Sequence, residues 1–293
     1  MIMRCAVKVS DLYYTYPDGT EALKGINFTA MQGEKVAVIG SNGSGKSTLF
    51  YHLNGLFFPT KGNVFINEEE ITKKNLDKIR MTVGLIFQDP DDQLFAPTVW
   101  ADVAFGPRNM GLSKREVEER VDNALKMLNI AGLKAKSPDN LSGGQKRLVS
   151  IAGVLAMNPK IIALDEPTSN LDPRSSSSLI RLLLDLNIRM NLTLIIATHD
   201  IDAVPLYAER IYIMDRGRFV VEGTPRAVFS DASVIRNSRL RLPRITHLME
   251  ILQKEDKLPI QNPYPLTIGE ARRELWNLVK PRNLKNRSND VAI

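Results

Sequence analysis

The chain is poor in cysteine, histidine and long apolar runs, and each scarcity excludes a class of protein. With Cys5 as its single cysteine it forms no internal disulfide, which agrees with a reducing compartment. Its longest apolar runs, such as residues 36–39 and 193–197, are far shorter than the roughly 20 residues of a membrane-spanning helix. No apolar segment precedes a small-residue cleavage site near the N-terminus, so we expect no secretory signal. Cysteine and histidine nowhere stand at the spacing of metal ligands.

The remaining composition is that of a globular protein with a sizeable core, since 43% of the residues are hydrophobic and 25% are charged. A length of 293 residues allows about two domains, or one large domain with an appendage. The net charge of +6 indicates either contact with nucleic acid or an anionic membrane, or scattered charge on a solvated surface. The densest basic cluster lies near the C-terminus and comprises Arg272, Arg273, Lys280, Arg282, Lys285 and Arg287.

Hydrophobic patterning predicts an α/β fold. Alternating apolar and polar residues at 7–9 and 26–30, with a turn at 17–19 between them, are typical of antiparallel strands. Later apolar runs are unbroken, as in strands buried on both faces of a parallel sheet. These runs lie at residues 36–39, 83–87, 161–164, 193–197 and 211–214. We therefore predict a parallel-sheet core with an antiparallel β subdomain.

A helical subdomain is expected at about residues 90–158. Its clearest helix begins at Ser113, where Glu116 completes a capping box and an apolar stripe follows at residues 117, 121, 125 and 128. Another helix is expected from about residue 144 to 157, ended by Asn158 and Pro159. After Phe229 the alternation of strand and helix stops, and residues 230–293 are expected to form a small helical extension. No internal repeat is present, so we expect one catalytic unit per chain.

A phosphate-binding loop follows the first buried strand. Its sequence satisfies the pattern G-x-x-x-x-G-K-[ST] and consists of Gly40, Ser41, Asn42, Gly43, Ser44, Gly45, Lys46, Ser47 and Thr48. Glycines let the backbone approach phosphate closely, and N–H groups at a helix start attract anions. We expect Lys46 to reach the β- and γ-phosphates and the Ser47 hydroxyl to bind Mg²⁺. The alternative is a glycine-rich turn that happens to contain a lysine.

Two adjacent carboxylates follow the strand at 161–164. Asp165 and Glu166 are costly to keep ionised at a buried strand end unless cations compensate, and Mg²⁺ with ATP would do so. We expect Asp165 to hold Mg²⁺ and Glu166 to act as general base toward water. Taken alone, such a pair is more often the start of a solvated loop, but the upstream phosphate-binding loop favours the catalytic interpretation.

A second anion-binding surface is predicted at the segment Leu141-Ser142-Gly143-Gly144-Gln145. Ser142 is a favourable helix N-cap, and the two glycines expose backbone N–H groups at a helix start. The segment resembles the signature motif of ABC transporter ATPases. The resemblance covers about residues 7–229, and we assign residues 1–229 to a nucleotide-binding domain of this family. It implies that two cassettes pair head to tail, each ATP lying between one phosphate-binding loop and the partner's signature helix.

The resemblance also implies roles for residues outside these motifs. Tyr16 resembles the aromatic residue that stacks on adenine, although an aromatic residue before proline is also a common strand end. Gln88 resembles the glutamine that contacts Mg²⁺ and its water and senses the membrane partner. Residues 169–172 resemble the loop that crosses the dimer interface. His199 resembles the histidine that contacts the γ-phosphate, so Lys46, Gln88, Glu166 and His199 form the expected catalytic set.

A narrower resemblance concerns residues 88–99 and 102–107, which are similar to the energy-coupling-factor ATPases of cobalt or nickel uptake. In that family this region receives helices of an integral transmembrane component, which works with a small membrane substrate-binding component. We expect Leu94 and Phe95 to be an exposed apolar pair flanked by acids, fitted to a helix that carries arginines. The resemblance also implies that the C-terminal extension assists dimerisation or regulation, and that the protein lies peripherally at the cytoplasmic face of the cell membrane.

The sequence leaves several alternatives open. The second cassette can be an identical chain or a relative, and the transported substrate can be cobalt, nickel or a vitamin. A conventional ABC importer ATPase is the main alternative, and residues 88–107 argue against it. A soluble ABC ATPase that acts on nucleic acid or the ribosome is a second alternative. We expect no nucleic-acid partner, because the chain has one cassette and no long heptad run.

Overall fold

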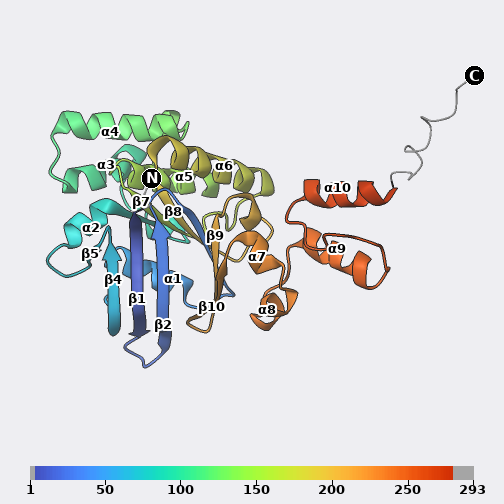
Figure 1. Cartoon of the computed structure of the whole chain (residues 1–293). Coiled ribbons are helices and arrows are strands. Elements are labelled where there is room, and N and C mark those ends of the chain that lie inside the picture. The colour runs from blue at the N-terminus through green and yellow to red at the C-terminus, as the bar shows by residue number, and fades with distance from the viewer. Residues whose placement is uncertain (1–3, 280–293) are drawn as a thin grey trace, which may run out of the picture.

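The computed structural model describes residues 4–279, which form two sheets and the helices around them (Figure 1). The larger sheet has the strand order β10-β9-β3-β8-β7-β6. Its strands are β3 (Lys35–Ile39), β6 (Val83–Ile86), β7 (Ile161–Asp165), β8 (Thr193–Thr198), β9 (Arg210–Asp215) and β10 (Arg218–Gly223). All neighbours pair in parallel except β9 and β10. The predicted α/β class and all five predicted buried strands are confirmed, with ends shifted by at most one residue.

The smaller sheet is antiparallel and has the order β2-β1-β4-β5. Its strands are β1 (Cys5–Thr15), β2 (Glu21–Met31), β4 (Lys61–Ile66) and β5 (Glu69–Glu70). The two alternating segments of the sequence are the paired strands β1 and β2, as predicted. Strands β4, β5 and β10 were not predicted.

The larger sheet is buried on both faces, and its residues alternate between two apolar cores. Ala37 and Ile39 of β3 face a core shared with helices, whereas Val36 and Val38 face a core shared with the antiparallel sheet. Helix α1 (Lys46–Leu53) contributes Leu49 to the second core. This two-sided burial explains the unbroken apolar runs, because each strand needs apolar side chains on both faces.

The helical region lies over the first core (Figure 1). Its helices are α3 (Val99–Asn109), α4 (Lys114–Met127), α5 (Gly143–Leu155) and α6 (Pro173–Met190), with short 3₁₀ turns at η1 (Pro90–Asp92), η2 (Ala131–Leu133), η3 (Pro138–Asn140) and η4 (Val204–Leu206). Helix α2 (Leu76–Thr82) instead buries Ile79 in the second core. Ser113 and Glu116 form the predicted capping box of α4, and the predicted apolar stripe of this helix is buried. Helix α5 ends two residues earlier than predicted.

Within the described part of the chain, the helices that follow the last strand are α7 (Pro225–Phe229), α8 (Ala232–Asn237), α9 (Arg244–Lys254) and α10 (Ile268–Val279). Helices α9 and α10 project at one end of the molecule (Figure 1) and enclose a small core around Met249, Ile260 and Ala271. Within residues 4–279, no helix combines the length and apolar character needed to cross a membrane. Of the basic cluster, Arg272 and Arg273 lie on α10, and Lys280, Arg282, Lys285 and Arg287 lie outside the described residues.

Candidate active site

The phosphate-binding loop connects β3 to α1, as predicted, and two of its glycines are sterically required. A Cβ atom on Gly40 would lie 2.5 Å from both the Met214 carbonyl oxygen and the Ser44 hydroxyl. Gly45 has φ +110°, a left-handed conformation that side chains disfavour, at the N-cap of α1. The loop therefore lies tight against the sheet edge and leads into the helix start that attracts anions.

Lys46 is buried and lies across the loop that precedes it. Its Nζ atom donates hydrogen bonds to the carbonyl oxygens of Gly40, at 2.8 Å, and Ser41, at 3.2 Å. The same atom lies 3.6 Å from Oε1 of Glu166. The ammonium group is thus held between the phosphate-binding loop and the carboxylate, where it can contact an anionic ligand.

The two predicted carboxylates lie at the carboxyl end of β7, and both are buried. Oδ1 of Asp165 and Oε1 of Glu166 lack hydrogen-bond partners. Burial raises the pKa of Asp165, and the negative charge of Glu166 raises it further, whereas the Ser47 hydroxyl and the Lys46 and Arg147 cations oppose the rise. Glu166 itself has φ +46°, a strained backbone conformation that is concentrated at functional sites.

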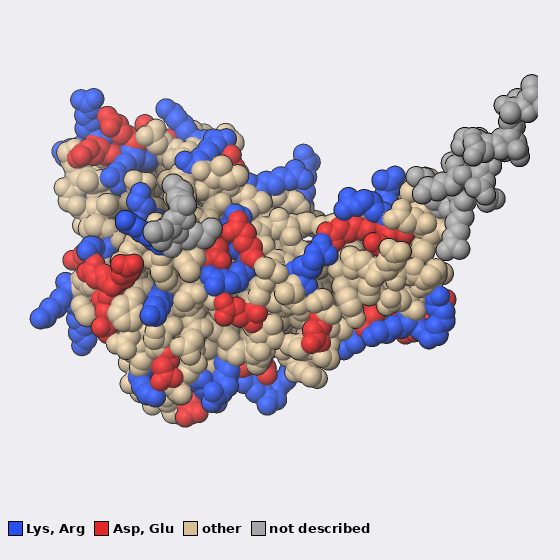
Figure 2. Space-filling model, in the orientation of Figure 1, with Lys and Arg blue, Asp and Glu red and all other residues tan. Residues whose placement is uncertain are grey.

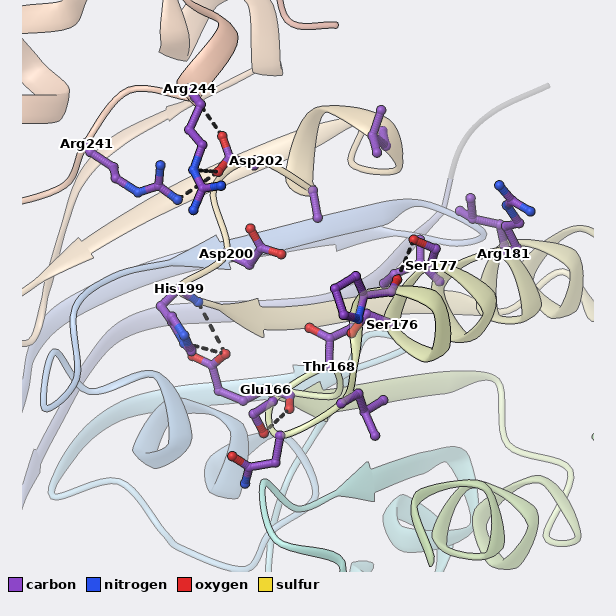
Figure 3. Close-up of a pocket in the computed structure, with 18 residues that line it drawn as sticks. Glu166, Thr168, Ser176, Ser177, Arg181, His199, Asp200, Asp202, Arg241 and Arg244 are labelled. Carbon is purple, nitrogen blue, oxygen red and sulfur yellow. Dashed lines mark hydrogen bonds and ion pairs between the residues drawn. The ribbon is translucent and has the colours of Figure 1, made fainter. Parts of the chain in front are cut away.

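His199 follows β8, the strand next to β7, so the two carboxyl ends meet at one sheet edge. Its Nδ1 atom lies 2.8 Å from Oε2 of Glu166, and its backbone N–H donates to the same oxygen at 3.3 Å (Figure 3). Glu166 therefore has one oxygen in contact with His199 and the other directed toward Lys46. This arrangement fixes the carboxylate and leaves the buried Oε1 without a hydrogen-bond partner.

A cavity of about 660 Å³ joins most of the predicted site. It is lined by residues 42–48 together with Tyr16, Gln88, Asp165 and Glu166, which the sequence placed there. It is also lined by residues that were not predicted: Thr20, Glu21, Ala22, Lys24, Arg216 and Gly217. The Tyr16 hydroxyl forms a 2.9 Å hydrogen bond with the Thr48 hydroxyl, and its ring packs edge-on against Tyr14 and Phe57. Arg216 and Gly217 come directly after β9 and have no motif that would have identified them.

Arg147 is a further site-forming residue that sequence reasoning missed. It is 2% exposed, in α5, and its guanidinium donates to the carbonyl oxygens of Phe87, at 2.5 Å, and Gln88. These contacts fix the start of the segment that carries Gln88, whose side chain is exposed at the cavity. The available signal was a charged residue within a helix whose other buried side chains, apart from Ser150, are apolar.

The signature segment caps α5 as predicted. The Ser142 hydroxyl accepts the N–H of Gln145, and the Gln145 side chain accepts the N–H of Ser142. Ser142, Gly144 and Gln145 line a separate cavity of about 460 Å³, together with Leu171 of the adjoining loop, and Gly143 is exposed beside them. Asp172 at the end of that loop caps α6. One chain thus carries its two predicted phosphate-binding surfaces in different cavities.

The residues predicted for Mg²⁺ fit a magnesium ion in their chemistry. Asp165 offers an unpartnered buried carboxylate oxygen, and Ser47 and Gln88 line the same cavity with oxygen donors. Among residues 4–279, no group of three or more His, Cys, Asp or Glu side chains forms a site for a metal. Magnesium is commonly held by one or two carboxylates together with substrate phosphates, which is the arrangement these residues allow.

The segment after Gln88 differs in part from the prediction. Phe95 is 66% exposed and packs edge-on against the half-exposed Phe105, with ring centroids 4.8 Å apart. Leu94 is instead half-buried against the main core, so the exposed apolar pair is Phe95 with Phe105. The carboxylate of Asp91, one of the flanking acids, is paired with Lys146 at 2.6 Å. The prediction failed because the segment folds back onto α3 and α5.

These features define a P-loop nucleoside triphosphatase: a glycine-rich loop leads from a parallel strand into a helix, and carboxylates lie at the end of a nearby strand. The ABC transporter family model matches residues 23–169. The energy-coupling factor transporter ATP-binding protein EcfA of Methanocaldococcus jannaschii is 55% identical over 278 residues, which are 94% of this chain and 99% of the relative. The EcfA protein of Methanococcus maripaludis is 53% identical, over 94% and 98% of the two chains. The chain therefore belongs to the ABC transporter family, as one of its energy-coupling factor ATPases.

Solved structures agree with this assignment. The structure of cbiO1 from Clostridium perfringens, described as part of the ABC transporter complex cbiONQ, is 49% identical with a TM-score of 0.73. The match covers 85% of this chain and 100% of cbiO1. The ATP-binding cassette MJ0796, in a dimeric post-hydrolysis state bound to ADP and Pi, is 33% identical with a TM-score of 0.68 over 75% of this chain and 99% of that one.

Proposed function

We propose that this chain hydrolyses ATP at the cluster of Lys46, Glu166 and His199 and thereby drives a membrane partner that imports cobalt or nickel ions. One observation carries the proposal: the Glu166 carboxylate is fixed between Lys46 and His199 at the wall of the cavity that the phosphate-binding loop lines, with one oxygen unpartnered. In this proposal residues 40–48 bind the phosphates through backbone N–H groups and the Lys46 ammonium. The Tyr16 ring stacks on adenine.

Glu166 is the proposed general base. Its unpartnered oxygen accepts a proton from water as the water oxygen bonds to the γ-phosphorus and the bond to the β-phosphate oxygen breaks, which yields ADP and phosphate. The contact of His199 with the other oxygen keeps the carboxylate directed toward the water, and His199 also contacts the γ-phosphate. Mg²⁺, held by Ser47, Asp165 and Gln88, would neutralise charge on the phosphates.

We infer that the active form is a dimer of cassettes. The signature segment at residues 142–145 lines a different cavity from the phosphate-binding loop, so each proposed site needs the signature of a second cassette. The dimeric MJ0796 cassette supports this inference. All motifs are intact in this chain, so a homodimer with two competent sites is the simpler form, and a heterodimer with a related cassette is the alternative.

The proposed docking surface for the transmembrane component is the aromatic pair of Phe95 and Phe105. Exposed aromatic side chains are costly in water and are enriched at protein interfaces. The backbone N–H of Phe95 donates to the buried Asp102 carboxylate, which fixes the loop that presents the ring. Because Gln88 and Phe95 belong to one segment, movement of a docked helix would reach the nucleotide site. The protein would then lie peripherally on the cytoplasmic face of the membrane, beside a small substrate-binding component.

Cobalt or nickel as cargo rests on the likeness to cbiO1 and to the energy-coupling-factor branch, with a vitamin as the alternative. The alternative of a conventional ABC importer ATPase differs in its membrane partners. For the nucleic-acid alternative, Figure 2 is relevant: lysine and arginine are interspersed with acidic side chains over the face it presents. Interspersed charge is typical of a solvated surface, which favours the transporter function.

The decisive experiment compares ATP hydrolysis by the purified wild type, Glu166→Gln and the matched control Glu209→Gln. Glu209 is a half-exposed glutamate paired with Lys35 outside the cavity. We expect Glu166→Gln to bind ATP while its turnover falls by about 100-fold or more, as for loss of a general base. Glu209→Gln should hydrolyse ATP at the wild-type rate. Near-normal turnover in Glu166→Gln would refute the assignment of the base.

The membrane partner is tested with the tagged Glu166→Gln chain and Mg-ATP in detergent-solubilised native membranes. Mass spectrometry of the captured proteins should identify a polytopic membrane protein and a small hydrophobic substrate-binding protein. A permease with a separate extracytoplasmic binding protein would instead establish a conventional importer. Ribosomal proteins or nucleic acid without a membrane protein would refute the transport function.

A further inference from the structure

The loop after β8 carries His199 near one end, and three residues later Asp202 contacts the C-terminal helices. The backbone N–H of Arg244 donates to Oδ1 of Asp202 at 2.6 Å, across 42 residues of sequence. Arg241 donates from Nη2 to Oδ2 at 2.7 Å, and Nε of Arg244 lies 3.4 Å from that oxygen (Figure 3). Both oxygens of Asp202 are therefore engaged by the segment that enters α9.

Asp202 acts as the missing cap of α9. Arg244 is the first residue of this 11-residue helix, and Pro243 at the N-cap position has no side-chain hydrogen bond to the helix. A carboxylate that accepts an N–H in the first turn satisfies a free backbone donor and favours the positive end of the helix dipole. Because this carboxylate comes from the loop of His199, any displacement of α9 changes the position of that loop.

The connection between Asp202 and His199 is short and ordered. Ile201 is 2% exposed in the main core, and its N–H donates to the His199 carbonyl at 3.1 Å. The Asp200 N–H donates to the Thr198 hydroxyl at 3.0 Å. Three residues span at most about 10 Å. Because this short segment is hydrogen-bonded, a displacement of Asp202 should displace His199 by a similar distance.

Packing against other side chains does not hold the His199 side chain in place. The imidazole is 59% exposed, and it borders a groove of about 860 Å³ that also contacts Glu166, Asp202, Arg241 and Arg244 (Figure 3). A side chain on an open groove wall takes its position from its backbone, and here the backbone is held at Thr198, Ile201 and Asp202. The contacts of Asp202 with Arg241 and Arg244 are therefore among the few constraints on the contact between His199 and Glu166.

We propose that Asp202 is a positioning residue for ATP hydrolysis: with Arg241 and Arg244 it ties the loop of His199 to the C-terminal helices, so that these helices control the base. This inference rests on the proposed roles of Glu166 and His199. It assigns the C-terminal helices a regulatory connection to the reaction, because a change in the position of α9 reaches the Glu166 carboxylate through Asp202 and His199.

The test compares Asp202→Ala with a matched control, Asp231→Ala. Asp231 caps α8 in the same part of the chain, with its Oδ1 accepting the N–H groups of Ser233 and Val234. Both variants lose a cap, so both should lower thermal stability to a similar extent. We expect Asp202→Ala to lower kcat about tenfold with KM for ATP within about twofold of wild type, whereas Asp231→Ala retains the wild-type kcat. Rates are measured at protein concentrations where kcat no longer rises.

A double-mutant cycle separates positioning from general destabilisation. Adding Asp202→Ala to His199→Ala should lower kcat by less than about twofold, because the histidine to be positioned is absent. The double variant Arg241→Ala, Arg244→Ala removes both side-chain contacts to Asp202 and leaves the backbone N–H of Arg244 in place. It should therefore lower kcat in the same direction as Asp202→Ala but by a smaller factor, and it serves as the test if Asp202→Ala does not fold. The inference is overturned if Asp202→Ala retains kcat as Asp231→Ala does, or if its effect multiplies with that of His199→Ala. Full activity of Glu166→Gln would refute the proposed function instead, since that result concerns the base itself.

Discussion

The guanidinium group of Arg147 donates a hydrogen bond to the backbone carbonyl of Gln88, although 59 residues separate them in the chain. A second guanidinium nitrogen donates to the Phe87 carbonyl. The buried arginine thus joins the helix behind the signature segment to the start of the proposed membrane-coupling segment. The position of helix α5 therefore constrains the position of the segment that begins at Gln88.

Removing this connection should cost stability and activity together. Arg147→Ala leaves two backbone carbonyls without their charged donor, so we expect the free energy of unfolding in urea to fall by about 2–4 kcal/mol. ATP turnover should fall as well, because Gln88 loses its fixed backbone. The control is Arg115→Ala, an 89% exposed arginine paired with Glu119, which should change stability by less than about 0.5 kcal/mol. Equal unfolding free energies for the two variants would contradict the role of Arg147.

Two substitutions of Tyr16 distinguish stacking by its ring from hydrogen bonding by its hydroxyl at the proposed adenine site. Tyr16→Ala removes the ring and should raise the Kd for ATP by about 5- to 150-fold, since stacking of a base on an aromatic side chain contributes about 1–3 kcal/mol. Tyr16→Phe removes only the hydroxyl that contacts Thr48 and should raise Kd by less than about fivefold. Calorimetric titration in the Glu166→Gln background measures both. The control Tyr13→Ala changes a neighbouring tyrosine that contacts Lys61, and it should bind ATP normally. Wild-type affinity in Tyr16→Ala would exclude stacking.

Asp165 should make the nucleotide-free protein less stable as pH rises. Burial raises the pKa of this carboxyl above the unfolded value of 3.8, so folding favours its protonated form. The resulting stabilisation is complete below the unfolded pKa and is lost as pH rises through the folded pKa. We therefore expect Asp165→Asn to melt at a higher temperature than wild type at pH 7 to 8, with the difference shrinking toward pH 4. Its turnover should nevertheless fall by about 100-fold or more through loss of the carboxylate proposed to hold Mg²⁺.

Melting curves of both proteins from pH 4 to pH 8, without nucleotide or Mg²⁺, measure this dependence. Asp185→Asn is a suitable control, because its exposed carboxylate pairs with Arg189 on the surface of α6. An Asp165→Asn protein that melts below wild type at pH 7 would show that the carboxylate is compensated in the free protein.

The sequence predicted those features whose signals are local. The strand β3, the phosphate-binding loop and the cap at Ser113 each depend on residues within a few positions of one another. The strand β4 was missed because it begins Lys61-Gly62-Asn63 and buries only two side chains, Val64 and Ile66. Its apolar run, residues 64–66, is only three residues long and was too short to be recognised as a strand.

The long-range contacts of the site could not be predicted in this way. Nothing near Arg147 or Asp202 in the sequence indicates that the first lies against Gln88 and the second against Arg241. Buried ion pairs and side-chain hydrogen bonds depend on how distant elements pack, and a charged residue in a helix is usually at the surface. The partial burial of Leu94 could not be predicted for the same reason. Its sequence neighbours are mostly polar, and it is buried by contact with the main core.

The aromatic pair Phe95 and Phe105 provides the last prediction, which concerns the membrane partner. Phe95→Ser with Phe105→Ser removes two exposed rings, so the change in unfolding free energy should stay within about 0.5 kcal/mol. Capture of the polytopic membrane protein by the tagged Glu166→Gln chain should be lost, because aromatic side chains dominate binding energy at interfaces. The matched control Ile188→Ser replaces a 79% exposed residue on α6 and should capture the partner as before. Undiminished capture by the Phe95, Phe105 double variant would show that the docking surface lies elsewhere on the cassette.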